Sequence, residues 1–370
     1  MFGRGCLQDC AADIIEQAPR TVLLVTGRSS YELVRPLVAV LESAGIAIKI
    51  QSGVRNEPTV DQFHSFFAEA AMQMPEVVVG VGGGSALDVA KLIAALLDSD
   101  QQISEIFDVD RLHARRTRLV CMPTTAGTGS EVSPNAVLLD TADSLKKGVV
   151  SRHLVPDAAY VDPCLTTTVP PAVTAATGMD ALTHCIEAYA NRFAHPAVDL
   201  YALAGIKLIG RHLCRVVQNG DDLDAREGMA LGSMYGGLCL GPVNTAAVHA
   251  LSYPLGGEFH IAHGLANAIL LPHVLEFNLP AMPERYAEVA KALGVVEDTH
   301  HSETARRGVE AIKTMMAQCR LSSSLRDLGI PESAIPGLAA SGMTISRLLK
   351  NNPREMTTSD AETIYWNAYR

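Results

Sequence analysis

The sequence has no excess of positive charge and no long hydrophobic run. Its 30 lysines and arginines are outnumbered by 40 aspartates and glutamates, which gives a formal net charge of −10. Without a strongly basic block, nucleic acid and anionic membrane surfaces are poor main partners. The longest apolar run, around VAKLIAALL (residues 89–97), is far too short to span a bilayer. We therefore expect neither a nucleic-acid-binding protein nor a membrane protein.

Paired cysteines at metal-binding spacing are also missing. The eight cysteines are scattered without any C-x-x-C motif, a pattern typical of reduced thiols in a cytoplasmic protein of this length. Cys6 and Cys10 lie one helical turn apart, but no second pair follows at ligand spacing, so they do not indicate a metal site. The N-terminus shows no charged segment followed by an apolar one, and we expect no signal peptide.

The composition and hydrophobic spacing of the chain change after about residue 165. Hydrophobic residues make up 48% of the 370 residues and charged residues 19%, which is typical of a soluble protein with a large core. The first part alternates short β-branched runs with helical patterns, whereas the remainder is rich in Ala, Leu and Met at helical spacing. We predict an α/β domain over residues 1–165 and an all-helical domain over residues 166–370.

Apolar strands between amphipathic helices predict a largely parallel sheet that is covered on both faces. The expected strands lie at residues 21–26, 46–50, 76–81, 118–123, 135–140 and 158–162. In the second domain, AVTAATGMDALTHCIEAYA (residues 172–190) is expected to form a helix that is entered through its glycine. Further helices are expected at residues 198–217, 224–240, 244–253, 264–279, 283–293 and 303–318.

A glycine cluster joins a strand directly to a helix in VVVGVGGGSALDVAK (residues 77–91). Glycines allow the backbone to approach an anion closely, and the helix that follows points its free N–H groups at the same place. Gly82, Gly83, Gly84 and Ser85 are therefore a candidate cradle for a diphosphate, with a plain tight turn as the alternative. The stretch matches neither G-x-G-x-x-G in register nor a P-loop.

A second loop, MPTTAGTGSEVS (residues 122–133), carries five hydroxyl residues and two glycines after a strand. Such a loop at the carboxyl end of a parallel strand can donate hydrogen bonds to phosphates or to a ribose. Two loops of this kind in one parallel sheet favour a bound dinucleotide. At the first strand, Gly27 and Arg28 stand where a carboxylate would bind the adenosine ribose and repel a 2′-phosphate. The arginine favours NADP(H), and NAD(H) stays open.

Four side chains suggest a metal site. Asp180 and His184 are four residues apart, so both project from one face of a helix. His249 and His263 would lie roughly 20 Å apart on one unbroken helix, but the proline and glycines between them predict a break at which the chain folds back. One carboxylate and three imidazoles suit Fe(II) or Zn(II), with a position left for a substrate oxygen.

Two further histidines receive different interpretations. His273 lies in an apolar helical pattern and is expected to be a hydrogen-bonded core residue. His260, three residues before His263, faces either the substrate or the solvent.

Four motifs together resemble the iron-containing (group III) alcohol dehydrogenases: GGGSALDVAK, PTTAGTGSEVS, GMDALTHCIEAY and HALSYPLGGEFHIAHGLANAILLPH. The resemblance runs from about residue 20 to beyond residue 290. It implies a Rossmann-like α/β domain followed by an all-α domain, a frame shared with dehydroquinate synthase, with the active site in the cleft between the domains.

The resemblance also implies site residues. Family members bind Fe(II) through one aspartate and three histidines, which fall here on Asp180, His184, His249 and His263. The implied cofactor contacts fall on Gly83, Gly84, Ser85, Asp88, Thr124, Thr125, Thr128, Asn135 and Lys146. The family position that sets NAD against NADP appears at Gly27, where aspartate generally accompanies a preference for NAD.

The implied reaction is hydride transfer between C4 of a nicotinamide and a small primary alcohol or aldehyde at the metal. Many family members carry a further histidine four residues after the first histidine of HALSYPLGG, and this chain has Tyr253 there. Tyr253 or His260 is the candidate proton relay, although an unperturbed tyrosine is a poor base near neutral pH. A homodimer is the family expectation.

Other functions compete with this reading. A maleylacetate-reductase-like oxidoreductase fits the same frame, although the full ligand set favours the metal-dependent branch. A dehydroquinate-synthase-like lyase would need a basic pocket for a phosphorylated carbocyclic substrate, and no cluster of lysines and arginines lies near the ligand helices. A non-catalytic nucleotide-binding protein would not need four metal ligands.

Overall fold

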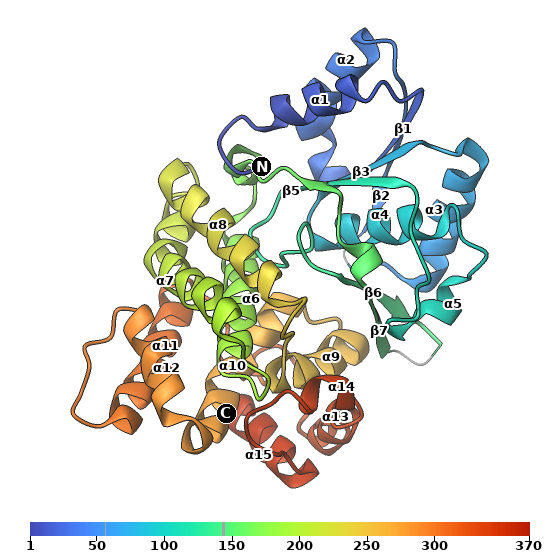
Figure 1. Ribbon diagram of the computed structural model, residues 1–370. Coiled ribbons are helices and arrows are strands. Elements are labelled where there is room, and N and C mark those ends of the chain that lie inside the picture. The colour runs from blue at the N-terminus through green and yellow to red at the C-terminus, as the bar shows by residue number, and fades with distance from the viewer. Residues whose placement is uncertain (56, 143–144) are drawn as a thin grey trace. The chain divides into compact units, whose positions relative to one another are not determined.

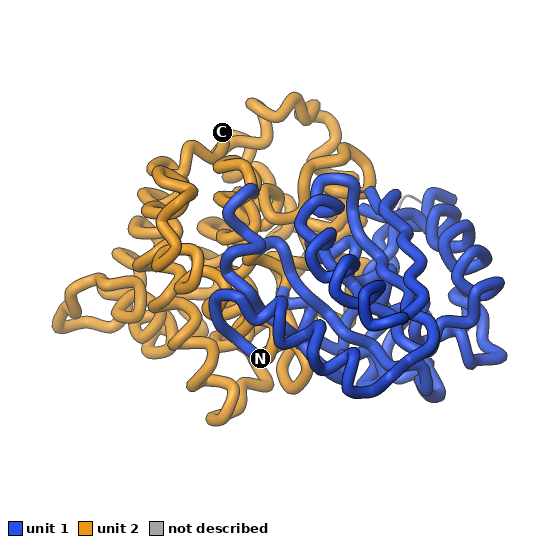
Figure 2. Tube along the Cα trace, turned by 90° about the horizontal axis from the view of Figure 1, so that it is seen from above, with its two compact units in different colours: residues 1–125, 129–168 blue, residues 126–128, 169–370 orange. Residues whose placement is uncertain are grey.

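The computed structural model describes residues 1–55, 57–142 and 145–370. The chain forms two compact units, which Figure 2 shows in different colours. Unit 1 comprises residues 1–125 and 129–168, and unit 2 comprises residues 126–128 and 169–370. Among the described residues, no helix has both the length and the apolar character that crossing a bilayer requires.

Unit 1 is built on a five-stranded sheet of order β2-β1-β3-β5-β8, in which every neighbouring pair is parallel (Figure 1). Its strands are β1 (Thr21–Gly27), β2 (Ala47–Val54), β3 (Val77–Gly82), β5 (Arg118–Pro123) and β8 (Ala158–Ala159). The predicted parallel sheet is confirmed, and the last strand is shorter than expected.

Helices cover both faces of this sheet. They are α1 (Leu7–Glu16), α2 (Tyr31–Ser43), α3 (Val60–Gln73), α4 (Gly84–Leu96) and the short α5 (Ile103–Ile106). Along β1, Val22 and Leu24 pack in one hydrophobic cluster with α1 and α2, while Leu23 and Val25 pack in another with α3 and α4. Successive side chains of a strand point to opposite faces, so an uninterrupted apolar strand is what a sheet buried on both sides requires.

The predicted strand at residues 135–140 does not belong to the parallel sheet. It forms β6 (Asn135–Asp140), which pairs antiparallel with β7 (Leu145–Val150) in a three-stranded sheet of order β4-β7-β6 that includes β4 (Asp108–Val109). The sequence between β6 and β7 is too short for the crossover that a parallel pair needs, but it suffices for an antiparallel pair. The sequence analysis did not identify β7, so it gave no sign that this strand lies outside the parallel sheet.

Unit 2 is helical, as predicted, and residues 169–370 contain no strand. Its helices surround one large hydrophobic core. They are α6 (Pro171–Tyr189), α7 (Pro196–Gln218), α8 (Leu223–Cys239), α9 (Ala247–Phe259), α10 (His263–Asn278), α11 (Pro283–Ala292), α12 (His301–Gln318), α13 (Ile335–Gly342), α14 (Ser346–Leu349) and α15 (Thr358–Tyr369).

Helix α6 is not entered through its glycine. It starts at Pro171, and Gly178 lies well inside it. A Cβ at Gly178 would come within 2.4 Å of the Leu213 side chain on α7, which real atoms do not permit. The glycine therefore allows two helices to pack closely, and it does not mark a helix boundary.

Helix α9 is not broken at the proline and glycines where the sequence predicted a break. It continues through Pro254 and both glycines and ends only at Phe259. A proline removes one helical hydrogen bond and strains the preceding turn, but here residues 247–257 are all buried, so packing offsets that cost. The chain reverses at His260, whose φ of +56° is left-handed, and α10 starts at His263. The two histidines are brought together by this later turn.

Candidate metal centre and cofactor-binding loops

Helix α6 presents three titratable side chains on one buried face. Asp180, His184 and Glu187 follow one another at helical intervals, and all three are at most 5% exposed. The Nε2 atom of His184 lies 3.8 Å from Oδ1 of Asp180. Burial of these groups is costly unless they are paired or hold an ion.

The other two predicted ligands approach the same carboxylate oxygen from α9 and α10. The Nε2 atom of His249 lies 3.6 Å from Oδ1 of Asp180, and that of His263 lies 3.7 Å from it. Close packing places His263, because a Cβ on the adjacent Gly264 would lie 2.3 Å from the carbonyl oxygen of Ala176. Only glycine lets the start of α10 sit directly on α6. The structure thus brings together the four side chains that the sequence suggested.

An asparagine lies at the centre of this group. The side-chain nitrogen of Asn267 lies 2.7 Å from Oδ1 of Asp180, 3.2 Å from Nε2 of His249 and 3.3 Å from Nε2 of His263. An amide NH2 has two hydrogens, so it cannot donate to all three neighbours at once. A buried carboxylate oxygen surrounded by imidazole nitrogens is an arrangement that suits a bound cation.

The donor set fits a divalent transition metal. Donors arranged tetrahedrally at about 2.1 Å from an ion are roughly 3.4 Å apart, close to the 3.6–3.8 Å between Asp180 Oδ1 and the three imidazole nitrogens. One carboxylate oxygen and three imidazole nitrogens suit iron or zinc. The potential ligand atoms of Asp180, His184 and His249 all lie within 4.8 Å of one another, and His263 approaches Asp180 from a more exposed side.

Electrostatics keep the carboxylate ionised. Burial acts to raise the pKa of Asp180, but the three histidines more than compensate and hold that pKa well below its usual range. Burial lowers the pKa of His184, which favours the neutral imidazole that can bind a metal. An anionic oxygen beside a neutral imidazole is the protonation state that metal ligands need.

Glu187 orients His249. Its Oε2 lies 2.6 Å from Nδ1 of His249, and its Oε1 accepts a hydrogen bond from the backbone nitrogen of Val248 at 2.6 Å. Burial acts to lower the pKa of His249, but Glu187 and Asp180 together raise it. A carboxylate on the far nitrogen fixes the tautomer and turns Nε2 toward the centre.

Sequence reasoning missed Glu187 and Asn267, although each had a signal. Glu187 follows His184 by three residues, and Asn267 follows His263 by four, so each shares a helix face with a ligand. What the spacing alone could not show is that both reach ligands carried by another helix.

The candidate proton-relay residues lie at different places. Tyr253 on α9 is 8% exposed, and its ring centroid lies 6.0 Å from that of His263. His260 is exposed at the C-terminal end of α9, where it provides the left-handed residue that stops the helix. His273 on α10 lies 3.9 Å from Glu276, and its buried Nδ1 has no hydrogen-bond partner among the described residues. The expected hydrogen bond is therefore absent at that atom.

In unit 1 the glycine-rich turn lies between β3 and α4. Gly83 is the N-cap of α4, no side chain caps the helix, and its first turn carries no acidic residue. Gly82 has a φ of +157°, and a Cβ there would lie 2.7 Å from the Cβ of Ala86. The turn therefore depends on glycine, and the positive end of the helix is left without a competing anion.

A buried network ties this helix to the second loop. The Asp88 carboxylate accepts hydrogen bonds from Ser130 Oγ at 2.6 Å and from the Val137 nitrogen at 3.0 Å. Nζ of Lys91 donates to the carbonyl oxygens of Ser130 and Asn135 at 2.8 and 2.6 Å. Burial raises the pKa of Asp88 and lowers that of Lys91. The network holds the hydroxyl-rich loop at the end of the strand.

Three further predicted cofactor residues, Ser85, Thr124 and Lys146, lie in unit 1 and have polar partners there. Oγ1 of Thr124 lies 3.2 Å from Oγ of Ser30, and Ser85 Oγ accepts a hydrogen bond from the Glu57 nitrogen at 3.2 Å. Lys146 pairs with Glu57 at 2.5 Å.

Five further positions that were predicted to bind the cofactor lie in different local environments. Gly27 ends β1 in an extended conformation, next to the exposed Arg28. A Cβ on Gly83 would lie 3.5 Å from Thr125, and Oδ1 of Asn135 is buried without a hydrogen-bond partner among the described residues. Gly84 begins α4, and Thr128 belongs to unit 2.

The fold is that of a class of alcohol-dehydrogenase oxidoreductases, as comparisons with known proteins show. Residues 1–163 match the family described as iron-containing alcohol dehydrogenase, and residues 174–369 match the C-terminal domain of the Fe-containing alcohol dehydrogenase family.

Individual relatives are similar along nearly their whole length. The chain is 37% identical to long-chain-alcohol dehydrogenase 1 of Geobacillus thermodenitrificans, over 99% of this chain and 94% of the relative. It is 32% identical to the NAD-dependent methanol dehydrogenase of Bacillus methanolicus, over 100% and 97%. A crystal structure of 1,3-propanediol oxidoreductase superposes with a TM-score of 0.95 at 32% identity, covering 100% of this chain and 97% of that one. The chain belongs to the iron-containing alcohol dehydrogenase family.

Proposed function

We propose that this protein is a metal-dependent, NAD(P)-linked alcohol dehydrogenase or aldehyde reductase. The observation that carries the proposal is the convergence of the Nε2 atoms of His184, His249 and His263 on Oδ1 of Asp180, at 3.6–3.8 Å. In this proposal the four side chains hold Fe(II), with Zn(II) as the alternative metal. The ion, when bound, supplies a Lewis acid for the oxygen of a small primary alcohol or aldehyde.

The protein's own groups set the geometry for hydride transfer. The turn at Gly83, Gly84 and Ser85 binds the diphosphate of the nicotinamide cofactor at the N-terminus of α4. Asp88 acts by holding the second loop, from which Thr124, Thr125 and Thr128 donate hydrogen bonds to the cofactor. Asn135 and Lys146 complete the contacts, and the buried free Oδ1 of Asn135 supports this role.

The proton is exchanged on the His263 side of the cluster. That side chain is 29% exposed, against 3% for Asp180, so solvent reaches the cluster there. Tyr253, whose ring lies beside His263, is the first candidate relay and His260 the second.

Cofactor preference is proposed to lie with NADP(H), because Gly27 lacks a carboxylate and Arg28 follows it. The NAD-dependent relative from Bacillus methanolicus keeps NAD(H) as the alternative. Replacing Gly27 with aspartate should lower kcat/KM for NADPH by about 10-fold or more relative to NADH, because a carboxylate repels the 2′-phosphate. An unchanged ratio of the two kcat/KM values would show that position 27 does not set the preference between NADPH and NADH.

The relatives' names, for long-chain alcohols, methanol and 1,3-propanediol, describe alcohol substrates and favour an oxidoreductase over a lyase. A maleylacetate-reductase-like activity is the second candidate within the oxidoreductases. We further propose a cytoplasmic homodimer that acts on a small-molecule substrate.

The test is reconstitution. Enzyme depleted of metal with a chelator is reloaded without oxygen using Fe(II) or Zn(II), and NADH and NADPH oxidation is measured against aldehydes and 2-oxo acids. We expect turnover to return with metal and not without it. The His263→Ala variant serves as a second arm. Turnover by that variant in the absence of bound metal contradicts the proposal.

A further inference from the structure

A cation, Arg347, contacts Tyr253 on the more exposed side of the ligand cluster. Nη2 of Arg347 on α14 donates a hydrogen bond to the Tyr253 hydroxyl at 3.2 Å, and its guanidinium carbon lies 5.8 Å from the centre of the Tyr253 ring. The same ring lies beside His263, the most exposed of the four ligands. His263, Tyr253 and Arg347 therefore follow one another outward from the buried carboxylate.

Arg347 contacts Tyr253, which belongs to a small apolar cluster, and it has no carboxylate partner among the described residues. Tyr253 packs in a small cluster with Ala250, Leu348 and neighbouring aliphatic side chains. Among the residues that the structure describes, no carboxylate lies within ion-pair distance of Arg347. The nearby segment 335–350 contains no aspartate or glutamate at all. A guanidinium without a carboxylate partner is available to an external anion.

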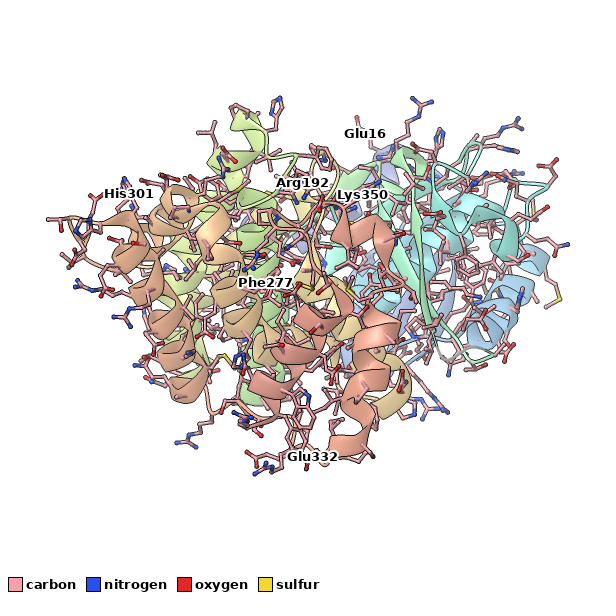
Figure 3. The ribbon with its side chains drawn as sticks, turned by 90° about the horizontal axis from the view of Figure 1, so that it is seen from below. Glu16, Arg192, Phe277, His301, Glu332 and Lys350 are labelled. Carbon is pink, nitrogen blue, oxygen red and sulfur yellow. The ribbon has the colours of Figure 1, made fainter. Side chains whose placement is uncertain are left out.

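The segment that carries Arg347 is held firmly. Lys350, labelled in Figure 3, caps the C-terminal end of α14. The next residue, Asn351, accepts a hydrogen bond from the Arg192 nitrogen at 2.8 Å, and its side-chain nitrogen donates to the Thr245 carbonyl at 2.7 Å. Because Thr245 lies just before α9, these bonds fix α14 relative to the helix that bears Tyr253 and His249. Arg347 is thus mounted on a rigid element, as a specificity group should be.

We propose that Arg347, with the Tyr253 hydroxyl, binds an anionic group at the far end of the substrate, so that the enzyme prefers short aldehydes or alcohols that carry a carboxylate, sulfonate or phosphate. This inference rests on the proposed function, because it assigns the substrate's reacting oxygen to the metal side of His263. With the Tyr253 hydroxyl at the far end of the substrate, the proton relay falls to the second candidate, His260. Arg347 presents paired N–H donors that match an oxyanion, and Tyr253 adds a hydroxyl beside them. The Tyr253 hydroxyl thus orients the guanidinium of Arg347.

The test compares 4-oxobutanoate with butanal, two aldehydes with the same chain length that differ in the terminal carboxylate. We expect the metal-loaded wild type to prefer 4-oxobutanoate by at least about 10-fold in kcat/KM. Arg347→Met should remove that preference chiefly through KM and change butanal reduction by less than about 3-fold. Arg347→Lys keeps a positive charge but lacks the paired N–H donors of the planar guanidinium, so it should retain part of the preference that Arg347→Met loses. Lys350→Met removes a nearby exposed charge and should leave both substrates unchanged.

Binding is measured separately from turnover. By calorimetry on the same metal-loaded enzyme, Arg347→Met should raise the Kd for 4-hydroxybutanoate by about 10-fold and leave that for 1-butanol unchanged. Equal losses for both aldehydes in Arg347→Met would mean that the arginine only supports Tyr253, and this would overturn the proposal. No preference for the anionic compounds in the wild type, in turnover or in binding, would also overturn it. Failure of the proposed function looks different: no aldehyde is reduced with either nicotinamide, while the binding data still decide the role of Arg347.

Discussion

Units 1 and 2 each bury a group of charged or titratable side chains, but only one of the two groups is complete. In unit 1, Nζ of Lys91 lies 2.6–2.8 Å from the carbonyl oxygens of Ser130, Ser133 and Asn135. In unit 2, Asp180, His249 and His263 share one amide NH2 from Asn267. A buried cation whose hydrogen bonds go to backbone carbonyl oxygens is structural, whereas a buried carboxylate surrounded by imidazole nitrogens has the donor types that bind a metal ion.

This difference predicts where a substitution acts. Removing a member of the unit 1 network should weaken folding, because it leaves polar groups unsatisfied in the core. Removing a member of the unit 2 cluster should mainly weaken metal binding, because burying these titratable groups is itself unfavourable in the metal-free protein. Four substitutions test the comparison, from the largest expected effect to the smallest.

Asp180→Ala should have the largest effect. It removes the only anion among the four candidate ligands, so we expect turnover to fall by at least about 1,000-fold, the result of losing several kcal/mol of transition-state stabilisation. Bound metal, measured by elemental analysis after gel filtration, should fall with it. Asp221→Ala, at an exposed position in unit 2, is the control. Full metal content and turnover in the Asp180 variant would show that this cluster is not the metal centre.

Lys91→Met should act on stability instead. Three carbonyl oxygens and the nearby Asp88 would lose their buried cation, and breaking such a network by removing one partner costs about 3–5 kcal/mol in the free energy of unfolding. Urea unfolding of the metal-free protein measures the loss. Lys147→Met, which removes a half-exposed partner of Asp140, should cost less than about 1 kcal/mol. Similar losses in the two variants would mean that the network does not stabilise unit 1 as described.

Glu187→Gln should weaken metal binding without removing a candidate ligand. The carboxylate that faces Nδ1 of His249 orients the ring and increases its basicity, and the loss of such a partner typically costs 10- to 100-fold in metal affinity, here about 1.4–2.7 kcal/mol. Competition with a chelator of known affinity measures the change. A metal affinity unchanged within about 2-fold would argue that helix packing alone positions His249.

Glu131→Gln tests the charge balance of unit 1. Glu131 is 2% exposed, and burial raises its pKa from 4.5 to about 7. The folded state therefore holds a proton that the unfolded state has lost above about pH 4.5, so this residue lowers stability increasingly as pH rises toward 7. Glutamine lacks this penalty.

The stability advantage of Glu131→Gln should accordingly grow by about 2 kcal/mol between about pH 5.5 and about pH 8. Urea unfolding of both proteins at the two pH values measures it. An advantage that does not change with pH would show that Glu131 is ionised in the folded protein.

Much of the fold could be predicted because the hydrophobic pattern within each short segment indicates whether that segment is a strand or a helix. Uninterrupted apolar strands required a sheet covered on both faces, and helical spacing identified the second unit. The prediction failed where tertiary packing overrides local preference. Pro254 and its neighbouring glycines do not end α9, since the buried surroundings of that helix offset the missing hydrogen bond. β6 pairs with β7 and not with the parallel sheet, and this pairing cannot be predicted unless β7 is recognised as a strand.

The candidate site shows the same division. Four ligand positions were recognisable, partly from helical spacing and partly from a family resemblance, because metal binding restricts residue type. Glu187 and Asn267 were missed, since an acid and an amide on a helix are ordinary until their partners are known.

The sequence by itself determined the period of each element, the residue types able to hold a metal, and the glycines that permit close backbone approach, because these depend on neighbours within a few positions. Only the tertiary structure decided that Asp180, His249 and His263 meet at one amide, that Glu187 turns His249 inward, and that Arg347 reaches Tyr253. Those contacts join residues up to 94 positions apart. Their distances follow from how helices pack, and packing is a property of the whole core.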